Sequence, residues 1–373
     1  MTRGPVVITG GGTGGHIFPM QAIGEQLLEQ GIPTDMLRYV GSRRGQEALL
    51  LGDSPVALTL LPGRGIRRSM TPRAVFANIA AVAGLVAAVT TAIVKVGRWR
   101  PSVVVSVGGY ASFAVSFAAV LWRRPLVLVE LDATSGAAHR VLERFARVRC
   151  VGFASSAPRT VLTGAPLRDG IESIDRSVPV RARARHDMDP PIDDDRKVVV
   201  VMTGSLGAAR VNRAVSQLAV LWRQRADRTL IQVTGRRDYD EVARSRLTGG
   251  ILDYRIVEFG DMTKLWPVCD AAVCRAGATT IAEVTALGIA SVLVPLPGAP
   301  GDHQTKNAQV VVSVGGARLV TDAECSAEML ASTLDEILEP DIVVAMEKAA
   351  ASIGRHHAAA SIAQVVSETG GWS

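Results

Sequence analysis

Aromatic side chains are scarce in this sequence, and cysteine is scarcer still. Phe, Tyr and Trp make up 4% of the 373 residues, and no run alternates them with Lys and Arg as in a groove for single-stranded nucleic acid. The cysteines, none in a C-x-x-C spacing, are Cys150, Cys269, Cys274 and Cys325. The sequence therefore gives no support for a nucleic-acid partner and indicates neither a zinc site nor a disulfide framework. We expect buried thiols.

The start of the sequence also lacks the pattern of a signal peptide. Residues 1–4 lead directly into an apolar strand pattern, which leaves no room for a charged region, an apolar core and a cleavage site. We therefore expect a cytoplasmic protein.

The composition describes a globular chain with a surplus of positive charge. Hydrophobic residues make up 48% and charged residues 20% of the sequence, and the length suffices for two domains. The sequence has 41 Lys and Arg residues and 35 acidic residues, which gives a net charge of +6. This surplus favours anionic partners such as nucleotide phosphates, lipid diphosphates or an anionic membrane surface.

One long apolar stretch, residues 74–94, is close to the ~20 residues that a membrane-spanning helix needs. Alanine is only weakly apolar, however, and a strand pattern resumes at Val103. We predict a helix packed on a sheet, and keep an interfacial helix on anionic lipid as a second hypothesis. The basic and aromatic residues for such a contact are Arg64, Arg67, Arg68, Arg73, Trp122, Arg123 and Arg124.

Short apolar runs alternate with helical patterns along the whole chain. We predict strands at residues 6–9, 36–40, 103–107, 126–129, 198–202, 229–233, 271–273 and 291–294. Such alternation is typical of βαβ units with parallel sheets. Residues 174–197 contain few apolar side chains, and we predict a surface loop or domain joint there.

The most informative motif is the glycine tract at residues 10–15, which links the first strand to a helical pattern and precedes His16. Glycine lets the backbone approach a ligand, and the N–H groups that open a helix point at anions or hydroxyls. We interpret the tract as a phosphate or sugar loop with His16 at its mouth. Its G-x-G-x-x-G spacing also fits a dinucleotide turn, but Asp35 precedes the second strand instead of ending it, which disfavours NAD or FAD.

Two loops of the second half have the same character. The motif G-S-L-G at residues 204–207 follows a strand, and G-A-T-T at residues 277–280 opens a helix. Glu283 lies about one turn into that helix, where a carboxylate can accept two hydrogen bonds from a ribose diol. Ligands of open α/β sheets bind at the carboxyl ends of the strands, so we expect the active site in a cleft between two domains.

Five motifs, in order and spanning nearly the whole chain, resemble those of the MurG family of glycosyltransferases. They are GGTGGHIFP at residues 11–19, SVGGY at 106–110, GSLGA at 204–208, RAGATTIAE at 275–283 and DHQTKNA at 302–308. That family transfers N-acetylglucosamine from UDP-N-acetylglucosamine to lipid I with inversion, and so makes lipid II for peptidoglycan. A lipid-linked acceptor also implies peripheral contact with the anionic inner face of the cell membrane.

The resemblance implies the GT-B fold, with two Rossmann-like domains whose parallel sheets face an interdomain cleft. The implied domains are residues 1–165 on the acceptor and membrane side, residues 166–350 for the UDP-sugar, and a helix in residues 351–373 that packs back on the first. The resemblance further implies no cofactor and no metal. Two D-x-D pairs, Asp187 with Asp189 and Asp193 with Asp195, could hold a divalent ion, but no strand precedes them.

The same resemblance gives individual residues expected roles. The implied donor-binding residues are Thr13, Gly14, Gly15, Arg168, Ser205, Phe259, Gly277, Ala278, Thr279, Thr280, Glu283, His303 and Gln304. The implied acceptor-binding residues are Gly14, Gly15, Tyr110, Glu130 and Asp132. In the donor set, Phe259 would cap the uracil, Glu283 would hold the ribose, and Arg168 would face the diphosphate. Gln304, with His303, would recognise the sugar hydroxyls.

His16 is the expected catalytic residue. We predict that it removes a proton from the acceptor hydroxyl as that oxygen attacks the anomeric carbon and expels UDP. The alternative is a role limited to orienting the substrate by hydrogen bonding.

Departures from the family pattern concentrate on the acceptor side. Residues 129–132 read V-E-L-D where the family usually has H-E-Q-N, and His139 and Ala165 each replace a common asparagine. Sites that lose polar partners discriminate differently among acceptors. Three functions therefore stay open: transfer to lipid I, transfer to a different acceptor such as a specialised metabolite or another lipid-linked intermediate, and non-catalytic binding of a sugar nucleotide or lipid diphosphate.

Overall fold

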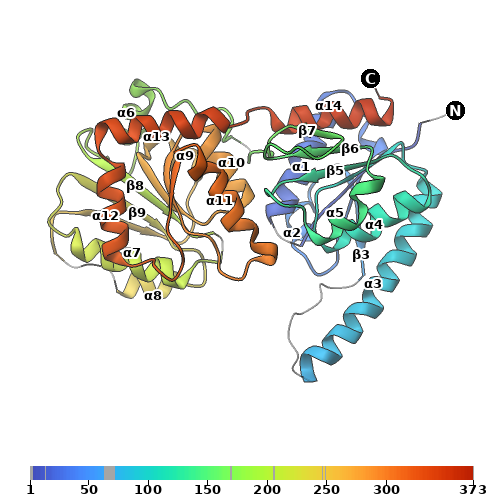
Figure 1. Ribbon diagram of the computed structural model, residues 1–373, viewed down its shortest axis with the longest axis horizontal. Helices are drawn as coiled ribbons and strands as arrows, with labels where there is room; N and C mark the ends of the chain where they lie inside the picture. Colours follow the sequence, from blue (N-terminus) through green and yellow to red (C-terminus); the bar gives the residue numbers. More distant parts are fainter. Residues whose placement is uncertain are drawn as a thin grey trace. The chain divides into compact units, whose positions relative to one another are not determined.

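A computed structural model describes residues 3–12, 14–62, 72–168, 170–204, 206–245, 247 and 249–372. The chain forms two compact units, Met1–Arg168 with His357–Ser373, and Asp169–His356 (Figure 1). The expected border at residue 350 falls inside a helix that continues to Ile353. The second unit therefore extends to His356.

The first unit contains a seven-stranded sheet in the order β3-β2-β1-β4-β5-β6-β7, in which neighbouring strands are parallel. Its strands are β1 (Val6–Thr9), β2 (Leu37–Ser42), β3 (Ala57–Leu61), β4 (Val103–Ser106), β5 (Leu126–Glu130), β6 (Val148–Val151) and β7 (Thr160–Leu162). Its helices are α1 (Gly14–Glu29), α2 (Glu47–Leu50), α3 (Pro72–Trp99), α4 (Tyr110–Leu121), α5 (Ala137–Leu142) and α14 (Ala358–Gly370), with short 3₁₀ turns at Thr34–Met36 and Glu143–Phe145. All residues of β1, β4 and β5 are buried, as expected for central strands of a parallel sheet.

The second unit contains a six-stranded parallel sheet in the order β10-β9-β8-β11-β12-β13. Its strands are β8 (Lys197–Met202), β9 (Arg228–Val233), β10 (Asp253–Val257), β11 (Ala271–Cys274), β12 (Ala290–Leu293) and β13 (Ala317–Leu319). Its helices are α6 (Val178–His186), α7 (Ala209–Leu221), α8 (Tyr239–Arg244), α9 (Met262–Val268), α10 (Ala278–Ala286), α11 (His303–Ser313), α12 (Ala327–Ile337) and α13 (Pro340–Ile353), with a 3₁₀ turn at Pro300–Asp302. The prediction of two parallel α/β sheets is confirmed.

The strands that sequence reasoning missed lie toward the sheet edges. They are β3, β6, β7, β10 and β13, and each has residues that are only partly buried. A strand with one accessible side mixes polar and apolar residues, so it gives no continuous apolar run.

The last helix, α14, belongs to the first unit and packs against α1. Ser367 Oγ donates a hydrogen bond to Gln30 Oε1 at 3.0 Å. Trp372 Nε1 donates to Ser102 Oγ at 2.9 Å. The chain thus leaves the first unit at Arg168 and returns to it for its last turns of helix.

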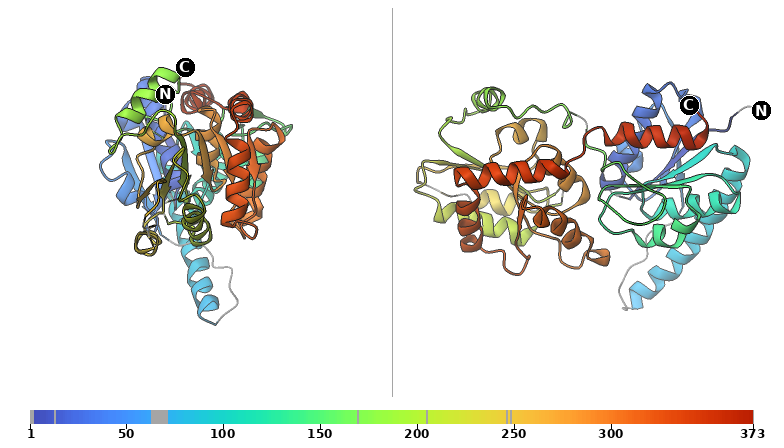
Figure 2. Two further views of the ribbon diagram at one scale, coloured as in Figure 1. Left: turned by 90° about the vertical axis from the view of Figure 1, so that its left-hand side faces the viewer. Right: turned by 45° about the horizontal axis from the view of Figure 1, so that its top comes forward.

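Helix α3 is longer than the apolar stretch that predicted it, and it packs chiefly on α4 instead of on the sheet. Ala88, Ala92 and Val96 form its buried stripe, whereas Val86 and Val94 are 57% and 70% exposed. Figures 1 and 2 show α3 extending beyond the rest of the first unit. Among the described residues, α3 contains the one window with the length and hydropathy of a membrane span, and 17% of it is buried. Length and composition alone are weak evidence for a span.

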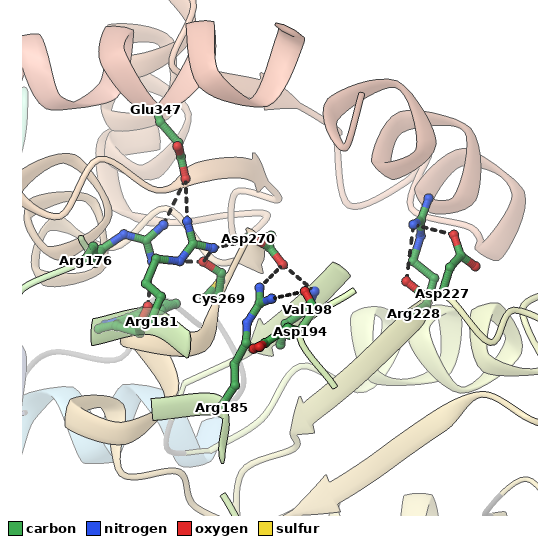
Figure 3. Close-up of polar contacts among 11 residues, drawn as sticks. Arg176, Arg181, Arg185, Asp194, Val198, Asp227, Arg228, Cys269, Asp270 and Glu347 are labelled. Atoms are coloured by element: carbon green, nitrogen blue, oxygen red, sulfur yellow. Dashed lines mark hydrogen bonds and ion pairs between the residues drawn. The ribbon is translucent and has the colours of Figure 1, made fainter. Parts of the chain in front are cut away.

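Residues 174–197, predicted to form a surface loop or domain joint, contain helix α6, and arginines hold it to the unit (Figure 3). Arg185 is 8% exposed and donates to Asp270 Oδ2 at 2.7 Å. Arg181 pairs with the other oxygen of Asp270, and Oδ2 also accepts from Val198 N at 2.6 Å. A helix therefore replaces the expected loop: the segment has few apolar residues, but a buried acid from a distant segment holds its arginines in place.

We expect Asp270→Ala to destabilise the second unit by about 3–5 kcal/mol, because it removes the carboxylate that two partly buried guanidinium groups share. Thermal unfolding followed by circular dichroism measures this as a lower melting temperature. Asp187→Ala is the control: it removes a side chain that is 64% exposed and lies 3.7 Å from Arg183, worth at most about 1 kcal/mol. Equal shifts for the two variants would contradict a structural role for Asp270.

Candidate active site

The glycine loop after β1 folds around a buried carboxylate. Gly11 and Gly12 have φ of 135° and 95°. Glu47 Oε1 accepts hydrogen bonds from Gly12 N at 3.0 Å and from Ser42 N at 2.8 Å, and Glu47 is 0% exposed. One N–H group of the predicted phosphate or sugar loop thus binds an internal carboxylate. Sequence reasoning missed Glu47, although the motif G-Q-E at residues 45–47, soon after a strand, was a visible signal.

His16 lies at the carboxyl edge of the central strands, in the first turn of α1, and is half-buried. A Cβ on Gly108, whose φ is 106°, would lie 3.0 Å from His16 Cδ2 and 3.1 Å from Nε2. A Cβ on Gly109 would lie 2.2 Å from the carbonyl oxygen of Gly11. The turns after β1 and β4 therefore approach so closely that positions 108 and 109 require glycine. This approach places the ring of His16 against the turn after β4.

The other predicted residues of the first unit lie near the same strand ends or at the end of the unit. Gly14 opens α1, where a Cβ would lie 2.9 Å from the ring of Phe18, and Gly15 is exposed. Tyr110 opens α4. Arg168 is half-buried and ends the first long segment of the unit. The side chain of Tyr110 and all of Thr13 fall outside the described residues.

Glu130 ends β5 and pairs with a histidine inside the unit. Its Oε2 lies 3.2 Å from His139 Nδ1, and it is 5% exposed. Burial by itself would raise the pKa of Glu130, but hydrogen bonds from His139 and Ser135 and the positive charges of His139 and Arg149 hold this pKa below its usual range. Asp132 is only half-buried. Of the two acids expected at the acceptor, Asp132 has the more accessible side chain.

In the second unit, the loop at residues 204–207 packs against a buried polar network. Gly207 has φ of 84°, and a Cβ there would lie 2.5 Å from Thr234 O and 2.6 Å from Asp238 Oδ2. Asn212 Nδ2 donates to both of these acceptors at 2.9 Å. The network therefore fixes the turn in which Ser205 was expected to act. Ser205 itself falls outside the described residues.

The start of α10 has the features of an anion-binding site. Gly277 is its N-cap and forms no side-chain capping bond, and the space around a Cβ there is open. Ala278, Thr279 and Thr280 are all half-buried. The first N–H groups of a helix have no acceptor within the helix, so they can bind an anionic group placed there.

Glu283 lies beneath this turn and is 0% exposed. Its Oε2 accepts a hydrogen bond from Trp266 Nε1 at 3.0 Å, so at least one carboxylate oxygen has a partner inside the unit. Asn307, also 0% exposed, donates to Ala276 O at 3.1 Å and ties α11 to the loop before α10. Sequence reasoning gave Asn307 no role, although it belongs to the motif DHQTKNA.

His303 and Gln304 open α11 and are oriented by the backbone before it. His303 Nδ1 lies 2.9 Å from Pro300 O. Gln304 Oε1 accepts a hydrogen bond from Leu296 N at 2.9 Å. Both side chains are half-buried and are fixed near the start of the helix.

Phe259 follows β10 and is 52% exposed. The guanidinium of Arg236, which follows β9, lies 5.5 Å from the centre of the Phe259 ring. An accessible ring flanked by a cation can stack on a planar base. This geometry suits the predicted contact with uracil.

The acids of the D-x-D pairs have basic neighbours. Asp187 lies 3.7 Å from Arg183 and Asp193 lies 3.0 Å from Arg196. In the part of the chain that the structure describes, no group of three His, Cys, Asp or Glu side chains could hold a metal ion.

Within each unit, most of the predicted residues gather at the carboxyl ends of the strands. In the first unit they follow β1, β4 and β5, which are neighbours in the sheet. In the second they follow β8, β10 and β11 or lie at the starts of α10 and α11. Each unit therefore presents one edge of loops and helix starts that can hold a ligand.

Comparison with known proteins agrees with this arrangement. The models of the glycosyltransferase family 28 N-terminal and C-terminal domains match residues 6–149 and 198–366. The crystal structure of Acinetobacter baumannii MurG has a TM-score of 0.77 and 24% identity, and the match covers 98% of this chain and 99% of that one. The two-domain GT-B architecture implied by the resemblance is thereby confirmed.

Curated relatives are similar over almost their whole length. A protein of Alkalilimnicola ehrlichii is 36% identical and one of Moorella thermoacetica is 35% identical, each match covering 98% of both chains. Both relatives are named UDP-N-acetylglucosamine--N-acetylmuramyl-(pentapeptide) pyrophosphoryl-undecaprenol N-acetylglucosamine transferase. With both domain models matched and relatives of this identity, the chain belongs to glycosyltransferase family 28 and, within it, to the MurG family.

Proposed function

We propose that this chain transfers N-acetylglucosamine from UDP-N-acetylglucosamine to the N-acetylmuramyl-(pentapeptide) pyrophosphoryl-undecaprenol acceptor, lipid I, and so makes lipid II for peptidoglycan. The main support is the similarity, over 98% of the chain, to relatives whose names state this transfer. The position of His16 between the turns after β1 and β4, and the open start of α10, are consistent with it.

The burial of the altered segment at residues 129–132 weakens the argument for a different acceptor. Val129, Glu130 and Leu131 are 1%, 5% and 7% exposed. Three of the four residues of this segment therefore lie in the interior of the unit. Differences from the family at these positions affect the packing of the interior more than the surface that an acceptor touches. Only Asp132 is accessible enough to contact an acceptor directly.

In the proposed mechanism, the acceptor hydroxyl oxygen attacks the anomeric carbon of the donor sugar. The bond from that carbon to the UDP oxygen breaks, and the configuration at the carbon inverts. His16 takes the hydroxyl proton, and UDP carries away the electron pair of the broken bond. A positioned base of this kind contributes about 10²–10⁴-fold to the rate.

The negative charge that develops on UDP needs fixed positive groups around the diphosphate. We assign this role to the N–H groups at the start of α10, with Arg168 and Ser205 as further donors. Phe259 and Glu283 would bind the uracil and the ribose, and His303 and Gln304 the sugar. The proposal needs no metal ion and no cofactor, because these groups supply the stabilisation of the leaving group.

We expect the purified chain to release UDP from UDP-N-acetylglucosamine when a soluble lipid I analogue is present, and EDTA to leave this rate unchanged. A coupled assay for UDP, with and without the analogue, measures it. Donor binding without analogue-dependent release would contradict the proposal. It would then support a different acceptor or a non-catalytic binding protein, and an acceptor screen separates these two.

Replacement of His16 by Ala should lower kcat by about 10²–10⁴-fold, because the acceptor loses its base, while donor affinity stays the same. Steady-state kinetics and calorimetric titration with UDP measure the two effects. His186→Ala removes an exposed histidine of the second unit and should change neither. A loss in kcat of less than about 10-fold for His16→Ala would leave only an orienting role.

We further propose that α3 and α4 place the first unit on the anionic inner face of the membrane. A groove beside α3 is lined by Arg38, Lys95, Arg98 and Trp99, among others. The charged ends of Arg38 and Lys95 lie 5.4 Å and 5.2 Å from the Trp99 ring. Arg64, Arg67 and Arg68 fall outside the described residues, and so does the side chain of Arg73.

Exposed apolar side chains also lie on α3, on α4 and directly after α4. The exposed ones are Val82, Val86, Val94, Phe117, Leu121 and Trp122. Basic side chains beside an exposed apolar face are typical of interfacial membrane contacts.

Sedimentation with vesicles should show tighter binding to anionic than to neutral lipid, and weaker binding at high salt. The double variant Lys95→Glu/Arg98→Glu should lose at least about 30-fold in affinity, since each basic residue contributes about 1 kcal/mol. Lys348→Glu/Arg355→Glu makes the same charge change on exposed residues of the second unit and should bind like the wild type. Equal binding to neutral and anionic vesicles at low salt would rule out an electrostatic dock.

A further inference from the structure

Three buried polar side chains form a connected cluster behind the turn that contacts His16. His139 Nε2 lies 2.8 Å from Ser106 Oγ, and His139 Nδ1 lies 3.2 Å from Glu130 Oε2. Ser106, His139 and Glu130 are 0%, 3% and 5% exposed. Both ring nitrogens of His139 therefore have partners inside the first unit.

The register of the strands brings these residues together. Ser106 pairs with Leu128 across β4 and β5, and Leu128 pairs with Arg149 across β5 and β6. Paired residues of neighbouring strands, and residues two apart on one strand, point to the same face of a sheet. Ser106, Arg149 and Glu130 therefore share one face. Helix α5 brings His139 onto that face.

The contact between Glu130 and His139 lies among further charged groups. Arg149 Nη2 lies 3.9 Å from Glu130 Oε1 and 3.4 Å from Glu143 Oε2, and it also donates to Ser135 Oγ at 2.9 Å. The side chain of Arg149 is 12% exposed and that of Glu130 is 6% exposed. Removing one partner of such a buried pair leaves an uncompensated charge in the interior.

The cluster has the composition of a Ser-His-acid triad, but its burial excludes a nucleophilic serine. Ser106 is 0% exposed at the end of a central strand, so a substrate cannot reach its Oγ. The cluster can act only on the residues that surround it.

The turn at Gly108 connects this cluster with His16. His139 Cε1 lies 4.0 Å from the position of a Cβ on Gly108, and His16 Cδ2 and Nε2 lie 3.0 Å and 3.1 Å from the same point. The two imidazole rings thus flank one turn of backbone. A change in the position or charge of His139 is therefore transmitted to His16 over a short path.

We propose that His139, fixed by Glu130 and Ser106, is a positioning residue that sets the orientation and the charge environment of His16 through the Gly108 turn. This inference rests on the proposed role of His16 as the base. It gives Glu130, which the resemblance placed at the acceptor, the different task of holding His139.

Replacement of His139 by Ala should lower kcat by about 10²-fold, because misplacing a reacting group by 1 Å can cost that much. The KM for UDP-N-acetylglucosamine should stay within about twofold, since most of the residues expected to bind the donor lie in the second unit. Glu130→Gln should show the same split between kcat and KM. The double variant should lose no more than His139→Ala alone, because the two residues act as one unit.

The pH profile separates positioning from a mere loss of packing. A base must be unprotonated, so kcat/KM rises with pH as His16 loses its proton. In His139→Ala, the carboxylate of Glu130 loses the hydrogen bond and the electrostatic contribution of His139 that lower its pKa, and its negative charge favours protonated His16. In His139→Ala, the acidic limb of the profile, where kcat/KM rises with pH, should therefore move to higher pH. In Glu130→Gln, this limb should not move to higher pH. The other charged groups near the cluster and the glycine loop, present in every variant, are Arg149, Glu143 and Glu47.

Two further variants control for folding. His139→Ala should lower the melting temperature. His139→Gln has a similar size and keeps hydrogen-bonding groups but no charge, so it should regain that melting temperature and still move the acidic limb. Cys150→Ala removes a side chain that is 0% exposed and, one residue after Arg149 on β6, points to the opposite face. It should lower stability and leave kcat unchanged. The proposal is wrong if the limb stays in place in both His139 variants, or if Cys150→Ala reproduces their loss of kcat.

Titration of the His16 ring by NMR, in the wild type and in His139→Gln, reports the same shift without turnover. If the pKa of His16 shifts but the wild type transfers no sugar, the positioning role of His139 stands and the proposed function is rejected. Transfer that depends on His16, with no shift in the titration, would uphold the function and reject the positioning role.

Discussion

The close approach of two backbone turns, after β1 and after β4, is the constraint on which the site of the first unit depends. These strands are neighbours in a parallel sheet, so the segments that follow them both leave the sheet at the same edge. A Cβ on Gly109 would lie 2.2 Å from Gly11 O, and one on Gly108 would lie 3.0 Å from the His16 ring. A side chain at either position would push the turns apart and take His16 out of place.

Buried glutamates hold the loops that surround this contact and the start of α10 in the second unit. Glu47, Glu130 and Glu283 are at most 5% exposed. Glu47 accepts from backbone N–H groups, Glu130 pairs with His139, and Glu283 accepts from the indole of Trp266. Leaving such a carboxylate without partners in the interior is costly, so these contacts fix the loops rigidly. Glu130, which the resemblance suggested as a ligand, can thus have a supporting role.

The central strands and the active-site loops could be predicted because their signals lie in short segments. β1, β4, β5 and β8 are buried on both faces and give unbroken apolar runs. The edge strands, such as β7 and β13, are partly accessible and give mixed patterns. Helix α6 was missed for a related reason. Its arginines look like surface residues until Asp270, far away in the sequence, comes to lie beside them.

The sequence by itself determined the parallel α/β class, the placing of glycine loops after strands, and the motif order that identifies the family, because each is written in residues close together in the chain. The tertiary structure decided which distant side chains meet. It bonded the backbone N–H of Gly12 to the carboxylate of Glu47, paired Glu130 with His139, and left most of Val82–Trp99 on α3 accessible. The physical reason is that the periodicity of apolar residues indicates how deeply a segment is buried, whereas strand register and helix packing determine which side chains it contacts.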